Sequence, residues 1–227
     1  SAGPVVPGEL VVTPKPVASS SPETTVWFLE RESGNIFSYL VGQKTLTRVS
    51  NKTVPGIQSA AWLPNASSTF VRYLSGTDSL TINTFSLPVG EGGGFFLPQN
   101  LADVAVSPTN ILTLTSGVNG STASLMRLDG THATTVFSTP LSDLRVSFAG
   151  KSAYLATTKA SAALLGDAFI VDAKGFFARV AGPRNGLVAL ASTSGKWVLV
   201  SYTLNSAMAM ELVNVATGEK LPLPVAT

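Results

Sequence analysis

Four short apolar stretches recur along this chain: Phe70-Val71-Arg72-Tyr73, Ile111-Leu112-Thr113-Leu114, Ala153-Tyr154-Leu155-Ala156 and Trp197-Val198-Leu199-Val200. Their first residues are 41, 42 and 44 positions apart. A second series of apolar positions keeps step with them at intervals of 43, 44 and 43 residues, namely Ile82, Leu125, Phe169 and Leu212. A period of about 40–45 residues with four short strands per unit is typical of a β-propeller blade. The chain is therefore predicted to be an all-β protein, a β-propeller with about five four-stranded blades.

The repeat begins after a proline-rich segment. Residues 1–24 hold five of the 14 prolines together with Ser19-Ser20-Ser21, a composition that favours an extended linker or arm, with a disordered tail as the alternative. Residues 25–227 form the predicted propeller domain. Glycine turns such as Asp129-Gly130 and Lys174-Gly175 separate its strands. The predicted blades cover about 25–50, 57–98, 101–140, 143–184 and 187–224.

The first unit lacks a first strand directly before Val26, which leaves two ways to complete the propeller. In a closed five-bladed ring, Leu10-Val11-Val12 would supply that strand or seal the last blade. In an arc of a larger ring, sequence outside this chain or another protomer would complete it. The second arrangement is favoured, because Leu221-Pro222-Leu223 ends the last unit abruptly. An arc exposes blade faces and strand edges, so an oligomer is possible.

Composition excludes several classes of partner. Charged residues make up 12% of the chain, about half the usual ~25%. The net charge is +2 and the basic residues are scattered singly, so no nucleic acid partner is expected. The chain has no cysteine, which excludes disulfides and thiolate chemistry. No run approaches the ~18 apolar residues of a membrane span, so no direct span is expected in this chain.

One unit carries the motif that suggests a family. Val104-Ala105-Val106-Ser107-Pro108, followed by the strand at Ile111 and the turn at Asp129-Gly130, resembles the WD40-like (PD40-like) repeat of TolB-type β-propellers. In that family a strand runs into Ser-Pro-Asp-Gly, whereas Thr109-Asn110 replaces the Asp-Gly here. The chain is also similar to envelope-anchored bacterial propellers with a short N-terminal tether. That resemblance implies an extracytoplasmic location at the cell envelope or surface, with tethering through the N-terminal linker.

The best catalytic candidates are two carboxylates. Asp103 and Asp143 both lie at the start of a predicted innermost strand, in successive units. Glycoside hydrolysis needs two carboxyl groups roughly 5–10 Å apart across a sugar, so this pair is the outside candidate for a catalytic site. The alternative is that each aspartate is a turn or cap residue.

Other candidate groups favour structural roles. His132 is the only histidine and follows a turn, which predicts a solvated residue rather than a catalytic base. Asp167 and Asp172 flank a strand at opposite ends and would lie too far apart to share a calcium ion. We therefore expect no metal and no cofactor. Asn51, Asn65 and Asn119 begin glycosylation triplets in predicted loops, and the three tryptophans lie within or beside strands, where core packing is expected.

These features favour a non-enzymatic binding or scaffold module of a bacterial cell envelope. It would contact a protein or a glycan through loops on one face of the propeller. The alternatives are a carbohydrate-active hydrolase that uses Asp103 and Asp143, and a structural subunit of a surface assembly. An enzyme is the less favoured reading, and the binding residues are not predicted.

Overall fold

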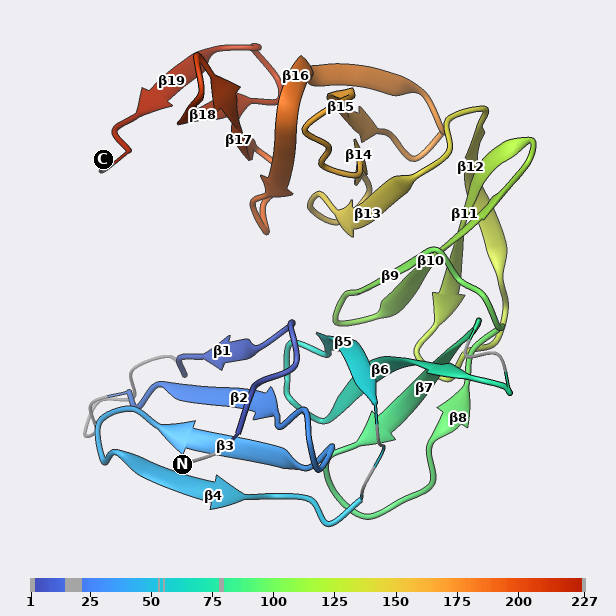
Figure 1. The fold of residues 1–227 in the computed structure, drawn as a ribbon, viewed down its shortest axis with the longest axis vertical. Coiled ribbons are helices and arrows are strands. Elements are labelled where there is room, and N and C mark those ends of the chain that lie inside the picture. Colours follow the sequence, from blue (N-terminus) through green and yellow to red (C-terminus); the bar gives the residue numbers. More distant parts are fainter. Residues whose placement is uncertain (1–2, 15–21, 53, 55, 78–79, 226–227) are drawn as a thin grey trace. The chain divides into compact units, whose positions relative to one another are not determined.

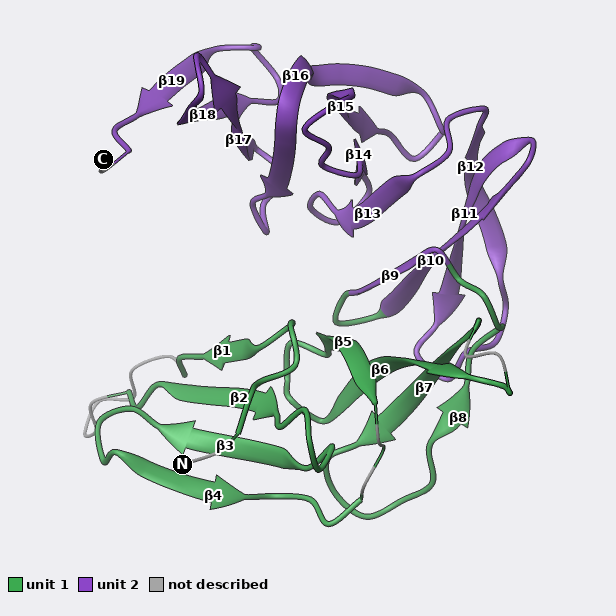
Figure 2. Cartoon of the chain, in the orientation of Figure 1, with its two compact units in different colours: residues 1–101, 107–109 green, residues 102–106, 110–227 purple. Residues whose placement is uncertain are grey.

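The computed structural model describes residues 3–14, 22–52, 54, 56–77 and 80–225, in which every regular element is a β-strand (Figure 1). The strands form three four-stranded antiparallel sheets and one seven-stranded sheet. The prediction of an all-β protein built from four-stranded blades is confirmed. The chain divides into two compact units, residues 1–101 with 107–109 and residues 102–106 with 110–227 (Figure 2).

The first unit contains two blades. The strands of blade 1 are, in spatial order, β1 (Leu10–Val12), β2 (Thr25–Leu29), β3 (Ile36–Leu40) and β4 (Thr45–Arg48). The strands of blade 2 are β5 (Ile57–Trp62), β6 (Ser68–Ser75), β7 (Thr81–Pro88) and β8 (Phe95–Phe96). One hydrophobic core joins these blades, since Leu29 and Ile36 of blade 1 pack with Ile57 and Val71 of blade 2.

The first strand of blade 1 comes from the proline-rich N-terminal segment. Leu10–Val12 pairs with β2 in antiparallel register, with Leu10 opposite Trp27. It therefore occupies the position that is vacant in the sequence directly before Val26. The two strands are joined by residues 13–24, of which 15–21 lie outside the described residues.

The residues before β1 are tied to both blades. The backbone N–H of Val6 donates to Leu29 O (2.9 Å), and the N–H of Ala60 in β5 donates to Pro7 O (2.9 Å). The indole Nε1 of buried Trp62 donates to Gly8 O (2.6 Å). Gly8 has φ +104, and a Cβ there would lie 1.9 Å from Ala60 O, so the close approach requires glycine. We call residues 3–12 the N-terminal arm.

The second unit begins with another four-stranded blade. The strands of blade 3 are β9 (Asp103–Val106), β10 (Asn110–Gly117), β11 (Gly120–Arg127) and β12 (Thr134–Thr139). Leu112 and Leu114 on β10 are fully buried against Leu144 and Val146 of the following sheet. This core joins blade 3 to blade 4.

Blades 4 and 5 share a single seven-stranded sheet. Its strands are β13 (Leu144–Phe148), β14 (Tyr154–Thr158), β15 (Leu165–Val171), β16 (Phe177–Ala191), β17 (Trp197–Leu204), β18 (Ala207–Asn214) and β19 (Lys220–Leu223). The first half of β16 pairs with β15 and ends blade 4, whereas its second half pairs with β17 and begins blade 5. The predicted boundary between 184 and 187 thus lies inside one continuous strand.

The tryptophan and tyrosine side chains, which the sequence predicts to pack in the core, differ in burial. Trp62 and Tyr154 are buried, whereas Trp27 and Trp197 are half-buried. The rings of Trp27 and Trp62 lie 6.5 Å apart between blades 1 and 2. This tryptophan pair therefore packs between two blades, as the alternation along the strands predicts.

Candidate functional site

The two aspartates singled out from the sequence each have a partner. Asp103 begins β9, and its Oδ2 accepts a hydrogen bond from the backbone N–H of Val146 in β13 (2.9 Å). The two residues are 43 positions apart, one repeat, so this carboxylate ties the innermost strands of blades 3 and 4 together. Asp143 directly precedes β13 and has φ +53. Its Oδ1 lies 3.3 Å from Lys159 Nζ at an exposed position.

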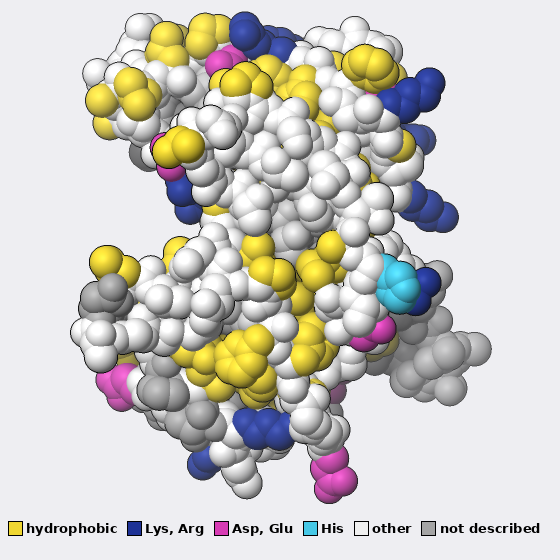
Figure 3. Space-filling model, turned by 90° about the vertical axis from the view of Figure 1, so that its right-hand side faces the viewer, with side chains coloured by type: hydrophobic (Ala, Val, Ile, Leu, Met, Phe, Trp, Pro, Cys, Tyr) yellow, Lys and Arg dark blue, Asp and Glu magenta, His cyan; other side chains and the backbone are white. Residues whose placement is uncertain are grey.

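His132 lies at the surface, where it is the cyan side chain of Figure 3. Its Nδ1 is 2.8 Å from Thr131 Oγ1. The neighbouring Asp129 accepts from the Thr131 hydroxyl and from the Thr131 backbone N–H, and these hydrogen bonds lower the pKa of the Asp129 carboxyl. The group is a polar turn.

The remaining polar candidates also serve local structure. Asp167 lies within β15 and forms an ion pair with Arg179 Nε (3.2 Å). Asp172 Oδ1 accepts from the backbone N–H groups of Lys174 and Phe176 and closes the β15–β16 turn. Within the described ranges, no group of three or more His, Cys, Asp or Glu side chains could hold a metal ion.

The asparagines of the glycosylation triplets lie in different local settings. Asn65 Oδ1 accepts hydrogen bonds from both the backbone N–H and the hydroxyl of Ser67, so its amide is engaged in a turn. Asn119 lies exposed at the tip of the β10–β11 hairpin. The triplet at Asn51 includes Thr53, which lies outside the described residues.

One end of the second unit brings together loops from three blades. The β10–β11 turn of blade 3, the β14–β15 loop of blade 4 and the β17–β18 turn of blade 5 all join a second strand to a third strand, and the β12–β13 loop lies beside them. We call this the hairpin-end surface. It comprises residues 117–120, 139–143, 159–165, 182–186 and 203–208.

A chain of contacts connects these loops. A Cβ on Gly120 would lie 2.1 Å from Thr139 O, so the β10–β11 tip and the end of β12 are in close contact. The backbone N–H of Lys159 donates to Asp143 O (2.8 Å), and that of Gly186 donates to Ser161 O (2.9 Å). The β10–β11 tip and the β14–β15 loop are thereby held to neighbouring segments of their own sheets.

The central part of the surface is a continuous strand ladder. Leu165 on β15 pairs with Asn185 on β16, which in turn pairs with Thr203 on β17, and Thr203 pairs with Met208 on β18. This row crosses four strands and links blade 4 to blade 5. A sheet holds side chains on such a row at fixed spacing, which preorganises them for contact with a partner.

The surface exposes several large apolar side chains at its tips. Leu164 is 72% exposed and Met208 59% exposed. On the hairpin-end surface, the exposed large apolar side chains are Val118, Leu141, Leu164, Leu165, Leu204 and Met208. Scattered exposed apolar residues are normal, but a set gathered on adjoining loops indicates an interaction surface.

Polar groups surround these apolar tips. An open cavity of about 610 Å³ lies against the β10–β11 tip, lined by residues 115–122 and 138–140. Hydroxyls line it, with Thr122 Oγ1 3.1 Å from Ser138 Oγ and Ser116 Oγ 3.3 Å from Ser121 Oγ. At the other side of the surface, the Arg184 guanidinium lies 4.9 Å from the centre of the Tyr202 ring. A cation held against an aromatic face is a typical anchor in protein interfaces.

Sequence reasoning anticipated loops on one face but not these residues. Leu164-Leu165 follows a turn and precedes a strand, so it looks like the start of a core strand. The available signal was the length of the connection, because six residues separate β14 from β15 whereas two separate β17 from β18.

The fold is shared with solved β-propellers of several kinds. The chain is similar to a chain of a nidogen/laminin complex (TM-score 0.62, 11% identity, 97% of this chain and 79% of that chain). It is similar to TolB from Acinetobacter baumannii (TM-score 0.61, 14% identity), covering 88% of this chain and 52% of the TolB chain. It is also similar to the β-propeller domain of the Trilobed protease from Pyrococcus furiosus (TM-score 0.62, 7% identity, 95% and 71% of the two chains).

These similarities confirm that the chain has a TolB-like β-propeller fold. At such low sequence identity, they show the fold alone. The chain spans about half the length of the TolB chain. No protein-family model matches the sequence, and no curated protein matches it. Among the residues that the structure describes, there is no helix long and apolar enough to cross a membrane.

Proposed function

We propose that this chain is a non-enzymatic binding or scaffold module that contacts a protein partner through the hairpin-end surface. The observation that carries the proposal is the set of large apolar side chains exposed on adjoining loops of blades 3, 4 and 5. Met208 ends the ladder that runs through Leu165 and Thr203, and Leu164 adjoins its other end. Burying such side chains against a partner contributes about 25 cal/mol per Å² of apolar surface removed from water.

A protein fits this surface better than a glycan does. Apolar leucine and methionine side chains complement apolar side chains of another protein, whereas a sugar presents mainly hydroxyls. Arg184 stacked on Tyr202 adds an anchor of the type that is enriched at the centres of protein interfaces. The hydroxyl-lined cavity at the β10–β11 tip would then form a polar rim, as protein interfaces commonly have.

We place the module outside the cytoplasm, at a bacterial cell envelope or surface. Support comes from the resemblance to envelope-anchored propellers and from the TolB-like fold. Tethering through residues 1–24 finds no support in the fold, because the N-terminal arm is bound along blades 1 and 2 and the proline-rich residues after it join β1 to β2.

The proposal is tested by cross-linking the chain to proteins of an envelope fraction. A single cross-linked species should form with the native chain and be lost in the double variant Leu164→Lys, Met208→Lys. The control for each lysine is Leu80→Lys, which places one positive charge on an exposed leucine of the first unit. A species that survives the double variant but not the control would overturn the assignment of the surface.

The carbohydrate-active alternative is tested separately. The Asp103 carboxylate accepts a hydrogen bond from the Val146 backbone N–H, so Asp103→Asn keeps an acceptor oxygen there while removing the charge. Turnover of a glycan panel by the native chain that is abolished in Asp103→Asn and in Asp143→Asn would contradict a non-enzymatic module. We expect no turnover by any of the three proteins.

A further inference from the structure

Two asparagine-glycine pairs occur in this chain, and the structure holds them in different ways. Asn119-Gly120 lies at the turn of the β10–β11 hairpin, whereas Asn185-Gly186 lies inside the long strand β16. An asparagine followed by glycine is the pair in which the next backbone nitrogen most easily attacks the side-chain amide, because glycine has no Cβ to obstruct the approach. By sequence alone, the two pairs are equally open to this reaction.

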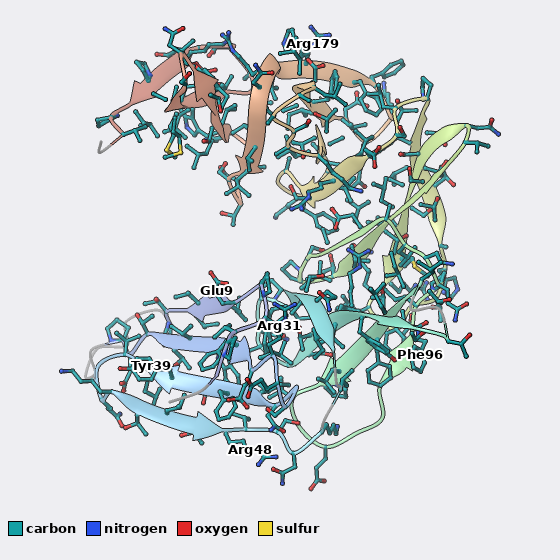
Figure 4. All side chains as sticks on the ribbon, viewed as in Figure 1. Glu9, Arg31, Tyr39, Arg48, Phe96 and Arg179 are labelled. Carbon is teal, nitrogen blue, oxygen red and sulfur yellow. The ribbon has the colours of Figure 1, made fainter. Side chains whose placement is uncertain are left out.

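The first pair lies where the strand pairing of the hairpin ends. Gly117 pairs with Gly120, so Val118 and Asn119 form the two-residue turn beyond the last paired position. Val118 is 102% exposed, and Asn119 is exposed as well. Figure 4 shows this turn as the light-green loop that projects from blade 3. The Asn119 backbone can therefore rotate into the geometry of attack without opening the ladder below the turn.

Glycine at position 120 is required by the fold. It has φ +108, and a Cβ there would clash with Thr139 O and would lie 2.6 Å from Pro140 Cα. A side chain at this position would thus collide with the backbone at the end of β12. The position after Asn119 therefore excludes the bulkier residues that would slow the attack.

Water reaches the same turn. The open cavity of about 610 Å³ is lined by the hairpin tip and by the end of β12. The hydroxyl-bearing side chains of Ser121, Thr122 and Ser138 form part of its wall. Solvent in this cavity can accept the proton of the attacking nitrogen and can later hydrolyse the product of the attack.

The second pair is held on both sides. Asn185 pairs with Leu165 on β15 and with Thr203 on β17. The backbone N–H of Gly186, which carries the attacking nitrogen, donates to Ser161 O (2.9 Å). Rotation at Asn185 would break this hydrogen bond and pull β16 from its neighbours. The Asn185 side chain is itself exposed, so the difference between the two pairs lies in the backbone.

We propose that Asn119 is a site of spontaneous deamidation, and that the fold protects Asn185 from the same reaction. The backbone nitrogen of Gly120 loses its proton to solvent and attacks Cγ of Asn119. A C–N bond forms, the bond from Cγ to the side-chain nitrogen breaks, and that nitrogen leaves as ammonia after taking a proton from solvent. The product is a succinimide ring that joins the two residues.

Water then opens the ring by one of two routes. Attack at the former side-chain carbonyl breaks its bond to the Gly120 nitrogen and leaves an aspartyl residue. Attack at the main-chain carbonyl leaves an isoaspartyl residue, in which the backbone runs through the former side chain. Overall one water is consumed and one ammonia is released, with no oxidation or reduction. Either product adds a carboxylate, which lowers the formal net charge of the chain by one from +2.

The reaction would also change the hairpin-end surface. The new carboxylate adjoins Val118, one of the exposed apolar side chains of that surface. A charge at this tip should weaken an apolar contact with a partner, because the carboxylate loses water when it is buried. This consequence rests on the proposed function, whereas the reaction at Asn119 does not.

Incubation of the folded chain at physiological temperature and mildly alkaline pH, followed by digestion and mass spectrometry, tests the proposal. The peptide that contains Asn119 should gain the mass difference between an amide and an acid, in two forms that chromatography separates. Its rate should exceed that of the Asn185 peptide by about tenfold or more, because reaction at Asn185 requires local opening of the strand. An isoaspartyl methyltransferase with a labelled methyl donor gives an independent count of the isoaspartyl product.

Two controls separate the effect of the fold from that of the sequence. Asn119→Gln keeps a side-chain amide but would have to close a larger ring, so its methyl label should fall to background while its circular dichroism matches that of the native chain. In urea the strand pairing is lost, and Asn185 should then react about as fast as Asn119. Equal rates at the two positions in the folded chain, or an Asn119 that reacts only in urea, would overturn the proposal.

Discussion

Blades 1 and 5 are the same four-stranded unit built in opposite ways. Blade 1 takes its first strand from Leu10–Val12 and resumes at Thr25, so its sheet is assembled from two separate stretches of chain. Blade 5 takes its first strand from the second half of β16, which continues without interruption from blade 4. A blade can therefore be completed either by a returning arm or by a shared strand. The two arrangements are therefore stabilised by different contacts.

In blade 1 the added strand also holds blade 2. The N-terminal arm contacts Leu29 of blade 1 and Ala60 and Trp62 of blade 2, and Val6 within it is fully buried. In blade 5 the last strand, β19, lies at the sheet edge with mostly exposed side chains. The two terminal strands should therefore differ strongly in their contribution to stability.

Removing each terminal strand should have the largest effect and the clearest asymmetry. Deletion of residues 1–12 removes two buried or half-buried apolar side chains, Val6 and Leu10, at about 1.5–3 kcal/mol each. It also leaves the β2 edge and the Trp62 indole without their partners. Deletion of residues 219–227 removes an edge strand and should cost much less. Denaturant unfolding of both truncated proteins measures the difference, and equal losses would show that the arm is not a structural part of blade 1.

A single side chain should reproduce much of the effect of the arm. Trp62→Ala removes a buried indole that contacts Trp27 and donates to Gly8 O, and it should destabilise the first unit by about 3–5 kcal/mol. Trp62→Phe keeps an aromatic ring but loses the N–H donor and part of the ring volume, so its cost should be smaller, about 1–3 kcal/mol. Trp197, half-buried at the start of β17, provides the comparison in blade 5. Denaturant unfolding of the variants gives these values, and a Trp62→Phe loss as large as that of Trp62→Ala would assign the effect to the hydrogen bond rather than to packing.

The smallest expected effect on stability comes from the Glu30 carboxylate, which binds the beginning of the N-terminal arm. The Glu30 carboxylate accepts hydrogen bonds from the Ser33 hydroxyl and from the Gly3 backbone N–H, and these lower the pKa of Glu30 below its ordinary value. A lowered pKa in the folded state stabilises the ionised form. The contribution is complete above the ordinary glutamate pKa of about 4.3 and disappears as the pH falls through the lowered pKa.

An NMR titration of the Glu30 carboxyl checks this sign. Ser33→Ala should raise the pKa of Glu30 toward its ordinary value, because it removes the larger of the two causes. The arm of this variant should also lose its hydrogen-exchange protection at a higher pH than the arm of the native chain. An unchanged titration in Ser33→Ala would show that the hydroxyl does not hold the carboxylate.

The repeat could be predicted because it depends on local signals. Apolar stretches recur every 41 to 44 residues and glycine turns lie between strands, and both features survive in the structure. The shared strand β16 could not be predicted, because Gly182-Pro183 within it has the composition of a turn. Its continuity depends on pairing with β15 on one side and β17 on the other.

The candidate site was less predictable for a different reason. Asp103 was found at the start of an innermost strand, but its hydrogen bond to Val146 depends on how two blades pack. The exposed leucines present the same difficulty. Leu164 at a loop tip is 72% exposed and Leu155 in the core is 1% exposed, yet both are leucines beside other apolar residues in the sequence. Only the tertiary contacts separate a solvent-exposed leucine from a buried one.

The most direct measurement of how blade 1 is completed uses the absence of cysteine in the native chain. Val11 of β1 pairs with Val26 of β2, so a short thiol-specific cross-linker should join the two positions within one molecule of a Val11→Cys, Val26→Cys protein. A Val11→Cys, Leu46→Cys protein places the thiols at opposite edges of the same sheet and should give far less of this product. Equal yields for the two proteins would contradict the account.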